Sequence, residues 1–390
     1  MAILRRGTTA IIGEEELRTR LERGDVLRVK LGVDPTARDV TLGWAVVLRK
    51  LRDFQRLGHQ AVLIIGNFTA QIGDPSGKSK TRRQLSPEEV RDNVASVIRQ
   101  FGKILDVERT EIRYNRDWLE KMGFEEVIRL CSRTTVARIM ERDDFAKRWQ
   151  EHRPIAMHEL LYPLCQGLDS VEVRADVELG GNDQRFNNLF GRHLQEEYGQ
   201  NPQAVVLSPL LVGTDGKEKM GQSLGNYIGV EEAPNEIFGK TMSIPDETIQ
   251  NWFELCTDVP LAEVDDLLGA GKNPRDAKVR LAREIVALYH SPEAGEAAEH
   301  YFTETFSQRR QPTDAEEITI PEECIDGGEV NLAALALTLG FVKSNGAFKE
   351  LVKAGAVALD GARVATPRLP EGEVRGRVLR VGKYHFRKLL

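Results

Sequence analysis

The sequence predicts an α/β protein: a parallel sheet covered by helices on both faces, followed by an α-helical region and a small α+β module. Two short apolar runs, residues 26–33 and 61–66, flank an amphipathic stretch, which is the pattern of parallel strands joined by a helix. Residues 234–310 have a helical pattern throughout. Residues 331–390 combine two short helical stretches with a hairpin pattern.

The first part of the chain is expected to alternate helices and strands. Residues 14–23 are charged and helix-prone, and the break at Asp34-Pro35-Thr36 separates the strand at 26–33 from a helix at 42–57. Ser86, Pro87 and Glu89 have the spacing of a capping box, which predicts that a helix begins there. Further strands are expected at residues 61–66, 112–115, 171–179 and 204–212.

The C-terminal module is basic. Short helices are expected at residues 331–339 and 344–354, followed by a hairpin at 357–364 and a strand at 377–381. Residues 331–390 carry 11 Lys+Arg and 4 Asp+Glu, a net charge of +7, in a chain whose net charge is −6. A basic module on an acidic body suggests that the module binds a polyanion, and charge alone leaves a solvated basic surface as the alternative.

The composition, 41% hydrophobic and 29% charged, is that of a globular protein that is soluble in water. No apolar run approaches the roughly 20 residues that cross a membrane, and the N-terminus has no signal-peptide pattern, so a cytoplasmic location without a membrane partner is expected. The four cysteines are far apart in the sequence. This spacing predicts reduced thiols rather than disulfides or a zinc site.

One predicted helix carries a polar stripe within an apolar sequence. Tyr162, Gln166 and Asp169 stand at positions i, i+4 and i+7, so a phenol, an amide and a carboxylate share one helix face. Burying such a stripe is costly unless it meets a polar partner, which points to a ligand. The alternative is that the stripe faces solvent.

Three other segments have the chemistry of a phosphate or nucleotide site. Residues 26–57 have a strand–turn–helix pattern, and in nucleotide-binding sheets such a segment usually binds the phosphate groups. Gly180 and Gly181 would let a ligand approach the backbone, and Asp183 could accept from ribose hydroxyls, although a paired-glycine turn is common. The loop at residues 74–83 carries Lys78, Lys80, Arg82 and Arg83, and the loop at residues 217–223 carries Lys217 and Lys219.

Taken together, these motifs closely resemble those of the tyrosyl-tRNA synthetases, class I aminoacyl-tRNA synthetases, in the longer bacterial form with a C-terminal S4 module. The resemblance extends from Arg6 to the end of the chain. It implies a Rossmann-like catalytic domain at residues 1–229, an α-helical anticodon-binding-type domain at 230–318, and a linker with an S4-like RNA-binding domain at 319–390. It also implies a homodimer joined through about residues 115–165, and the substrates tyrosine, tRNA(Tyr) and ATP with Mg²⁺.

The resemblance also implies roles for individual residues. Catalytic roles fall to Thr41, Trp44, Lys78, Arg82, Lys219 and Gln222. Tyrosine binding falls to Asp74, Tyr162, Gln166, Asp169 and Gln184, with Asp169 accepting from the substrate phenol and Asp74, Tyr162 and Gln166 holding the α-ammonium. ATP binding falls to Asp34, Thr36, Gly43, Gly181, Asp183, Lys219 and Met220.

The sequence departs from the family pattern on the phosphate side of the site. The His-x-Gly-His motif is Thr41-Leu42-Gly43-Trp44 here, and the Lys-Met-Ser-Lys-Ser loop has Gly221 and Gln222 at its third and fourth positions. The sequence predicts a tyrosine–tRNA ligase, a ligase whose activation step is impaired by the altered motifs. Two alternatives remain open: a diverged paralogue that activates tyrosine or an analogue outside translation, and a non-catalytic RNA-binding or regulatory protein.

Overall fold

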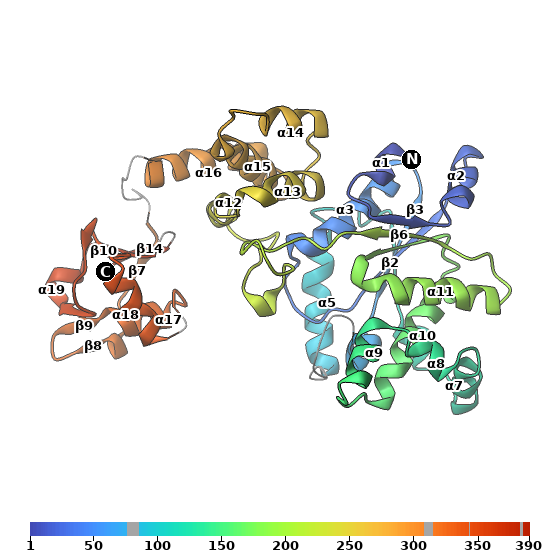
Figure 1. The fold of residues 1–390 in the computed structure, drawn as a ribbon. Helices are drawn as coiled ribbons and strands as arrows, with labels where there is room; N and C mark the ends of the chain where they lie inside the picture. The colour runs from blue at the N-terminus through green and yellow to red at the C-terminus, as the bar shows by residue number, and fades with distance from the viewer. Residues whose placement is uncertain (76–85, 308–314, 343, 383–384) are drawn as a thin grey trace. The chain divides into compact units, whose positions relative to one another are not determined.

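The computed structural model describes residues 1–75, 86–307, 315–342, 344–382 and 385–390. The chain forms two compact units (Figure 1). The first contains residues 1–232 and 240–289, and the second contains residues 233–239 and 290–390. The division into a catalytic, a helical and an S4-like domain stays a prediction.

The first unit is built on a six-stranded sheet with the order β1-β6-β5-β2-β3-β4, as far as the described residues show. Its strands are β1 (Ala10–Ile12), β2 (Arg28–Val33), β3 (Gln60–Ile65), β4 (Thr110–Tyr114), β5 (Val177–Gly181) and β6 (Ala204–Ser208). All neighbouring strands pair in parallel except β1, which runs antiparallel to β6 at the edge. The predicted α/β class with a Rossmann-like parallel sheet is therefore confirmed.

The connections of this sheet reverse direction between β2 and β5. The chain proceeds from β2 through β3 to β4 on one side, and from β5 to β6 on the other. In open parallel sheets the carboxyl ends of the strands on either side of such a switch point leave a crevice, which is the usual ligand site. Residues that follow β2 and β5 are therefore placed to share one site.

Helices cover the sheet on its two faces (Figure 1). The helix α3 (Leu42–Arg56) packs against β2, β3 and β5, because its apolar stripe faces the sheet. The long helix α10 (Met157–Glu172) packs along α11 (Arg185–Glu197), which contacts β5 and β6. The other helices before β6 are α1 (Ala2–Arg5), α2 (Glu14–Glu22), α4 (Thr69–Ile72), α5 (Pro87–Phe101), α6 (Arg116–Leu119), α7 (Phe124–Cys131), α8 (Val136–Ile139) and α9 (Asp143–Gln150).

The helical pattern predicted after residue 234 is confirmed. The helices are α12 (Pro234–Met242), α13 (Ile249–Cys256), α14 (Leu261–Leu267), α15 (Pro274–Tyr289) and α16 (Pro292–Phe302). In the first unit, α13 contacts both α3 and α15. Trp252 of α13 is fully buried there and donates to the Val212 carbonyl at 3.1 Å.

Two expected strands differ from the structure. Val171 still belongs to α10, which ends at Glu172, and β5 begins only at Val177. Val171 and Val173 are buried with the apolar residues of α10, so packing on the helix face prevails over their preference for strands. The strand expected at 204–212 ends at Ser208. The capping box at Ser86 and Glu89 is present as predicted.

The second unit contains a small α+β module. Its helices are α17 (Leu332–Thr338), α18 (Asn345–Lys353) and α19 (Glu371–Val374). Its strands are β7 (Glu317–Ile318), β8 (Ile325–Asp326), β9 (Glu329–Asn331), β10 (Val357–Leu359), β11 (Ala362–Arg363), β12 (Arg368–Pro370), β13 (Val378–Val381) and β14 (His385–Leu389). The two predicted helices, the hairpin β10–β11 and the strand β13 are all found, packed around Phe348 and Leu379.

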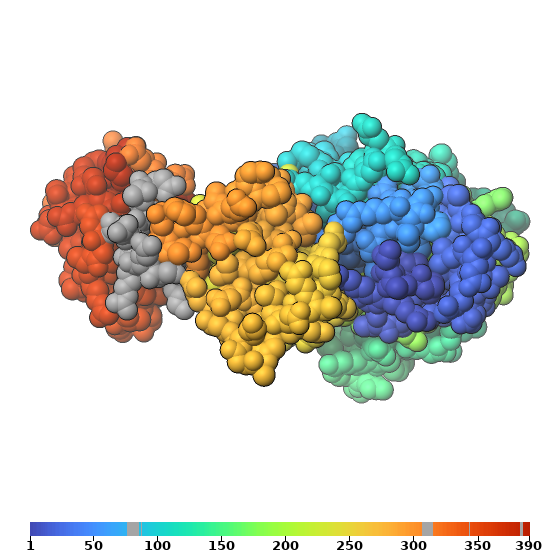
Figure 2. All heavy atoms as spheres, turned by 90° about the horizontal axis from the view of Figure 1, so that it is seen from above, coloured from blue at the N-terminus to red at the C-terminus, as the bar shows by residue number. Residues whose placement is uncertain are grey.

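Figure 2 shows the surface of the molecule. Within the described ranges, no helix combines the length and the apolar character that a membrane crossing needs. The four cysteines are free thiols.

Candidate active site

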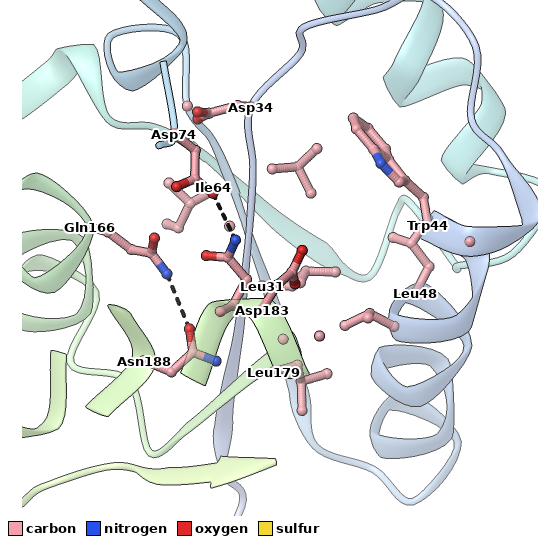
Figure 3. Close-up of a pocket in the computed structure, with 18 of the residues that line it drawn as sticks. Leu31, Asp34, Trp44, Leu48, Ile64, Asp74, Gln166, Leu179, Asp183 and Asn188 are labelled. Carbon is pink, nitrogen blue, oxygen red and sulfur yellow. Dashed lines mark hydrogen bonds between the residues drawn. The ribbon is translucent and has the colours of Figure 1, made fainter. Parts of the chain in front are cut away.

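A cavity of about 320 Å³ opens at the switch point of the sheet, among the carboxyl ends of β2, β3 and β5. Figure 3 shows its lining. It brings together thirteen of the residues that the sequence singled out: Asp34, Thr36, Gly43, Trp44, Asp74, Tyr162, Gln166, Asp169, Gly181, Asp183, Gln184, Lys219 and Met220.

The most deeply buried carboxyl of the cavity is that of Asp169, which is 3% exposed. Trp118 Nε1 donates to one of its oxygens at 2.9 Å, and Asn115 Nδ2 donates to the other at 3.3 Å. Burial raises the pKa of Asp169 to about 7, although the nearby Lys30 ammonium and the two donors favour the ionised form. The group is therefore a buried acceptor that titrates near neutral pH.

The polar stripe of α10 faces inward, so the alternative of a solvent-facing stripe is wrong. Tyr162 is 6% exposed, and its hydroxyl donates to Asp34 Oδ2 at 2.8 Å. The other oxygen of Asp34 accepts from Thr69 Oγ1 at 2.6 Å. Burial, with the carboxylates of Asp34 and Asp74, raises the pKa of the Tyr162 phenol, which therefore keeps its proton.

A second carboxylate lies at the rim of this pocket. Gly73, with φ +82°, ends α4 and turns the chain into Asp74, a backbone conformation that favours glycine. Asp74 accepts from Gln184 Nε2 at 2.7 Å and from the buried Arg142 at 3.0 Å. Asp74 and Gln184, two of the residues expected to bind tyrosine, are thus in direct contact (Figure 3).

The part of the cavity where the sequence predicts ATP binding lies at the start of α3. A side chain at Gly43 would meet Met220, and one at Gly181 would meet Asp183 and Leu210, so both backbones are close to opposing residues. The Lys219 ammonium lies 3.1 Å from Asp183 Oδ2. Trp44 lies in the first turn of α3, on the side of the cavity opposite Asp34 (Figure 3).

Two residues with expected catalytic roles do not line the cavity. Thr41 is buried at the N-cap of α3, where its hydroxyl accepts from the Trp44 amide at 3.4 Å. Gln222 donates to the Asp39 carbonyl at 2.7 Å. Lys78 and Arg82 lie outside the described residues.

Sequence reasoning missed three residues that hold the carboxylates of Asp169 and Asp74: Asn115, Trp118 and Arg142. Asn115 directly follows β4, and a polar residue at the carboxyl end of a parallel strand is a usable signal. Trp118 lies one turn further along the chain. Arg142 directly precedes α9, and no local signal distinguishes it from the other arginines of the sequence.

The fold and the cavity define an α/β protein with a candidate ligand site at the carboxyl ends of its parallel strands, where proteins of this class usually bind their ligands. Residues 22–307 match the family of tRNA synthetases class I (W and Y), and the chain belongs to this family.

Two tyrosine–tRNA ligases are similar to this chain over nearly its whole length. The tyrosine–tRNA ligase of Moorella thermoacetica is 52% identical over 398 residues, covering 100% of this chain and 95% of the relative. That of Thermotoga maritima is 48% identical over 394 residues, covering 99% of this chain and 96% of the relative.

Solved structures share the fold. A C-terminally truncated mitochondrial tyrosyl-tRNA synthetase of Aspergillus nidulans has a TM-score of 0.65 at 22% identity, covering 77% of this chain and 92% of that one. The tyrosyl-tRNA synthetase of Archaeoglobus fulgidus, complexed with L-tyrosine, has a TM-score of 0.62 at 22% identity and covers 76% of this chain and 97% of that one.

Proposed function

We propose that this chain is a tyrosine–tRNA ligase. The reaction joins tyrosine and ATP to tyrosyl-adenylate with release of pyrophosphate, and then transfers the tyrosyl group to tRNA(Tyr). The observation that carries the proposal is the buried carboxyl of Asp169 in the lining of the cavity, held by Trp118 and Asn115. The full-length similarity to tyrosine–tRNA ligases supports it.

The tyrosine half of the cavity fits the substrate at both ends. The phenol hydroxyl donates to Asp169, whereas phenylalanine offers this buried carboxyl no donor beyond Trp118 and Asn115. Tyrosyl-tRNA synthetases are the established example of this kind of discrimination. At the other end, the Tyr162 hydroxyl uses its hydrogen in the bond to Asp34 and has a lone pair with which to accept a hydrogen bond. Together with Asp74 and Gln166, it forms an acceptor-rich site for the α-ammonium.

The nucleotide half provides fewer positive charges than the family motif. Asp183 is placed to accept from the ribose hydroxyls, with Lys219 beside it for the phosphates. Thr41 and Trp44 stand where the family has histidines, and Gln222 replaces a lysine. Since one preorganised donor contributes about 10²–10³ in rate, the activation step of this chain is slow.

Mg²⁺ enters the proposed reaction with ATP, as part of the substrate. Across the described segments, no cluster of three His, Cys, Asp or Glu side chains could hold a metal ion. Mg²⁺ is commonly bound through substrate phosphates, and the proposal assigns it to the triphosphate.

The proposal includes a homodimer. Five large apolar side chains are exposed within residues 115–165, where the resemblance implies the dimer contact: Phe124, Ile128, Val136, Trp149 and Met157. Phe124, Trp149 and Met157 are 80%, 70% and 78% exposed. Such a concentration of exposed apolar groups is typical of a surface that another chain covers. Charging tRNA also implies a cytoplasmic location.

The RNA partner is assigned to the basic C-terminal module. Lys349 and Lys353 are exposed on α18, where they can contact a phosphate backbone. Replacing both by glutamate should weaken the binding of tRNA(Tyr) and leave tyrosine activation unchanged, because activation involves only the cavity of the first unit.

Tyrosine-dependent exchange of pyrophosphate into ATP tests the enzymatic proposal. The purified chain should catalyse slow exchange with tyrosine and none with phenylalanine, and Asp169→Ala should remove this preference. Absence of exchange in the presence of clear tyrosine binding would favour the non-catalytic alternative.

Trp44, Gly221 and Gln222 depart from the family motifs, and these departures favour a second candidate function. A diverged paralogue would activate tyrosine or an analogue but charge a different acceptor. Exchange with tyrosine, combined with no attachment of tyrosine to tRNA(Tyr), would identify this candidate.

A further inference from the structure

A charged network is buried directly behind the tyrosine half of the cavity, and no step of the proposed reaction uses it. Lys30 lies in the middle of β2 and Glu178 lies beside it in β5, with side chains 0% and 1% exposed. The Lys30 ammonium lies 2.9 Å from Glu178 Oε1. A buried ion pair of this kind is not favourable for stability by itself, because desolvation of both charges opposes their attraction.

All three protons of the Lys30 ammonium have partners. The ammonium donates to Glu178 Oε1 at 2.9 Å, to Ser170 Oγ at 2.7 Å and to the main-chain carbonyl of Gln166 at 3.0 Å. Gln166 and Ser170 are one turn apart on α10, and Asp169 lies between them. The ammonium thus fixes the turn of α10 that carries two of the expected tyrosine contacts.

Glu178 accepts from four donors. Its Oε1 accepts from Lys30 and from Gln166 Nε2 at 3.2 Å, and its Oε2 accepts from Ser170 at 3.2 Å and from Gln203. The packing around this group is tight, since a side chain at Gly191 would lie 3.1 Å from Glu178 Oε2. Glu178 is therefore held rigidly, with one of its bonds reaching a residue of the cavity.

That bond decides which end of the Gln166 amide faces the ligand. A carboxylate only accepts, so the nitrogen of Gln166 must face Glu178 and the oxygen must face away from it. The Asn188 amide is consistent with this arrangement, because its oxygen accepts from Gln166 Nε2 at 3.1 Å (Figure 3). Rotation of the Asn188 amide would give its nitrogen an acceptor in Glu178 Oε1 at 3.2 Å, but would also place that nitrogen 3.1 Å from Gln166 Nε2, which is itself a donor.

We propose that Glu178, held by Lys30, is a positioning residue for amino-acid recognition: it turns the Gln166 oxygen toward the cavity, where that oxygen accepts from the α-ammonium of tyrosine. The proposal rests on the function proposed above. A glutamine amide free to rotate would also present its nitrogen to the ammonium and repel it. Glu178 removes this alternative before the substrate arrives.

The test compares two ligands that differ only in the group that Gln166 contacts. Tyrosine carries the α-ammonium, and 3-(4-hydroxyphenyl)propanoic acid lacks it but keeps the phenol and the carboxylate. Binding of both is measured by calorimetry with the full-length chain and with Glu178→Gln, Gln166→Ala and the double variant. Glu178→Gln should weaken tyrosine binding about 10- to 100-fold and leave the binding of the propanoic acid unchanged.

The double variant tests whether the effects of Glu178 and Gln166 on tyrosine affinity are coupled. If Glu178 acts through Gln166, then adding Glu178→Gln to Gln166→Ala costs no further tyrosine affinity. Asp169→Asn is the matched control, because it should weaken both ligands alike through the phenol. If Glu178→Gln does not fold, Lys30→Met with Glu178→Met removes both charges at similar volume, and a thermal melt verifies its fold.

The outcomes separate the two proposals. Loss that is selective for tyrosine supports the positioning role. Equal loss for both ligands, or no loss, overturns it and leaves the ligase proposal standing. If the unmodified chain binds neither ligand, the proposed function itself fails and this role fails with it.

Discussion

At Asp169, burial and hydrogen bonding act in opposite directions on a single carboxyl group. Burial favours the neutral acid, whereas Lys30, Trp118 and Asn115 favour the carboxylate, and the pKa settles at about 7. The folded protein thus holds a proton that the unfolded chain releases near pH 4, so this group makes stability fall as pH rises from about 4 to about 7. Proton loss at Asp169 costs stability and creates an acceptor for the phenol.

Discrimination between tyrosine and phenylalanine should therefore increase with pH. The ionised Asp169 accepts from the phenol of tyrosine, whereas phenylalanine brings no donor for the charge, so phenylalanine binds better to the neutral acid. The ratio of the tyrosine affinity to the phenylalanine affinity should therefore rise with pH through the region around 7, by at most about tenfold per pH unit. Dissociation constants for both amino acids between about pH 5.5 and 8.5 measure this ratio. A ratio that is equal at the two ends of this range, or that also varies in Asp169→Asn, would contradict the assignment.

Trp44 is the altered motif residue that lies in the cavity. Trp44→His should raise the rate of tyrosine-dependent pyrophosphate exchange by about 10²-fold, because an imidazole supplies a donor where charge develops on the phosphates. Trp44→Phe is the matched control, since it keeps an aromatic ring without a donor and should not accelerate exchange. Equal acceleration in both variants would mean that the indole acts only by its bulk.

Some contacts of individual residues in the site could be predicted from the sequence, and others could not. Lys30 and Glu178 each interrupt an apolar strand, so the sequence marks them as unusual, but their pairing depends on β2 and β5 being neighbours although the two residues are 148 positions apart. The α10 stripe was predictable because helical spacing alone places Tyr162, Gln166 and Asp169 together. Arg142 was not, because its contact with Asp74 joins residues 68 positions apart through the folding of the chain.

Among the elements, α3 is the one that places Gly43 and Trp44 in the lining of the cavity. The sequence predicts its start from the break at residues 34–36, and the structure begins it at Leu42, capped by Thr41. The end of α10 was harder to predict, because Val171 and Val173 suit a strand and a buried helix face equally. Tertiary packing, absent from local sequence, decides between the two.

The cap gives Thr41 a structural role that is separable from catalysis. Thr41→Ala should lower the free energy of unfolding by about 0.5–1 kcal/mol, at the lower end for a lost cap because the bond to Trp44 is 3.4 Å long. Thr41→Ser should retain most of this stability. Urea denaturation measures both variants. Equal stability of Thr41→Ala and the unmodified chain would remove the capping role.

At the scale of the whole molecule, the exposed apolar side chains within residues 115–165 predict self-association. Trp149→Glu should shift the protein from dimer to monomer in sedimentation measurements, because a charge placed in an apolar contact remains unpaired. Leu261→Glu is a matched control, since Leu261 is also an exposed apolar residue, at 41%, but lies on α14. Dimers that survive Trp149→Glu would place the contact elsewhere.

The pair formed by Lys30 and Glu178 also constrains how this lineage can change. Removing one member leaves a lone buried charge, which costs about 3–5 kcal/mol, whereas replacing both by apolar residues is often close to neutral. Single substitutions at either site are therefore selected against, and the two must be exchanged together or retained together. In related sequences, the amino acids at positions 30 and 178 should therefore vary together.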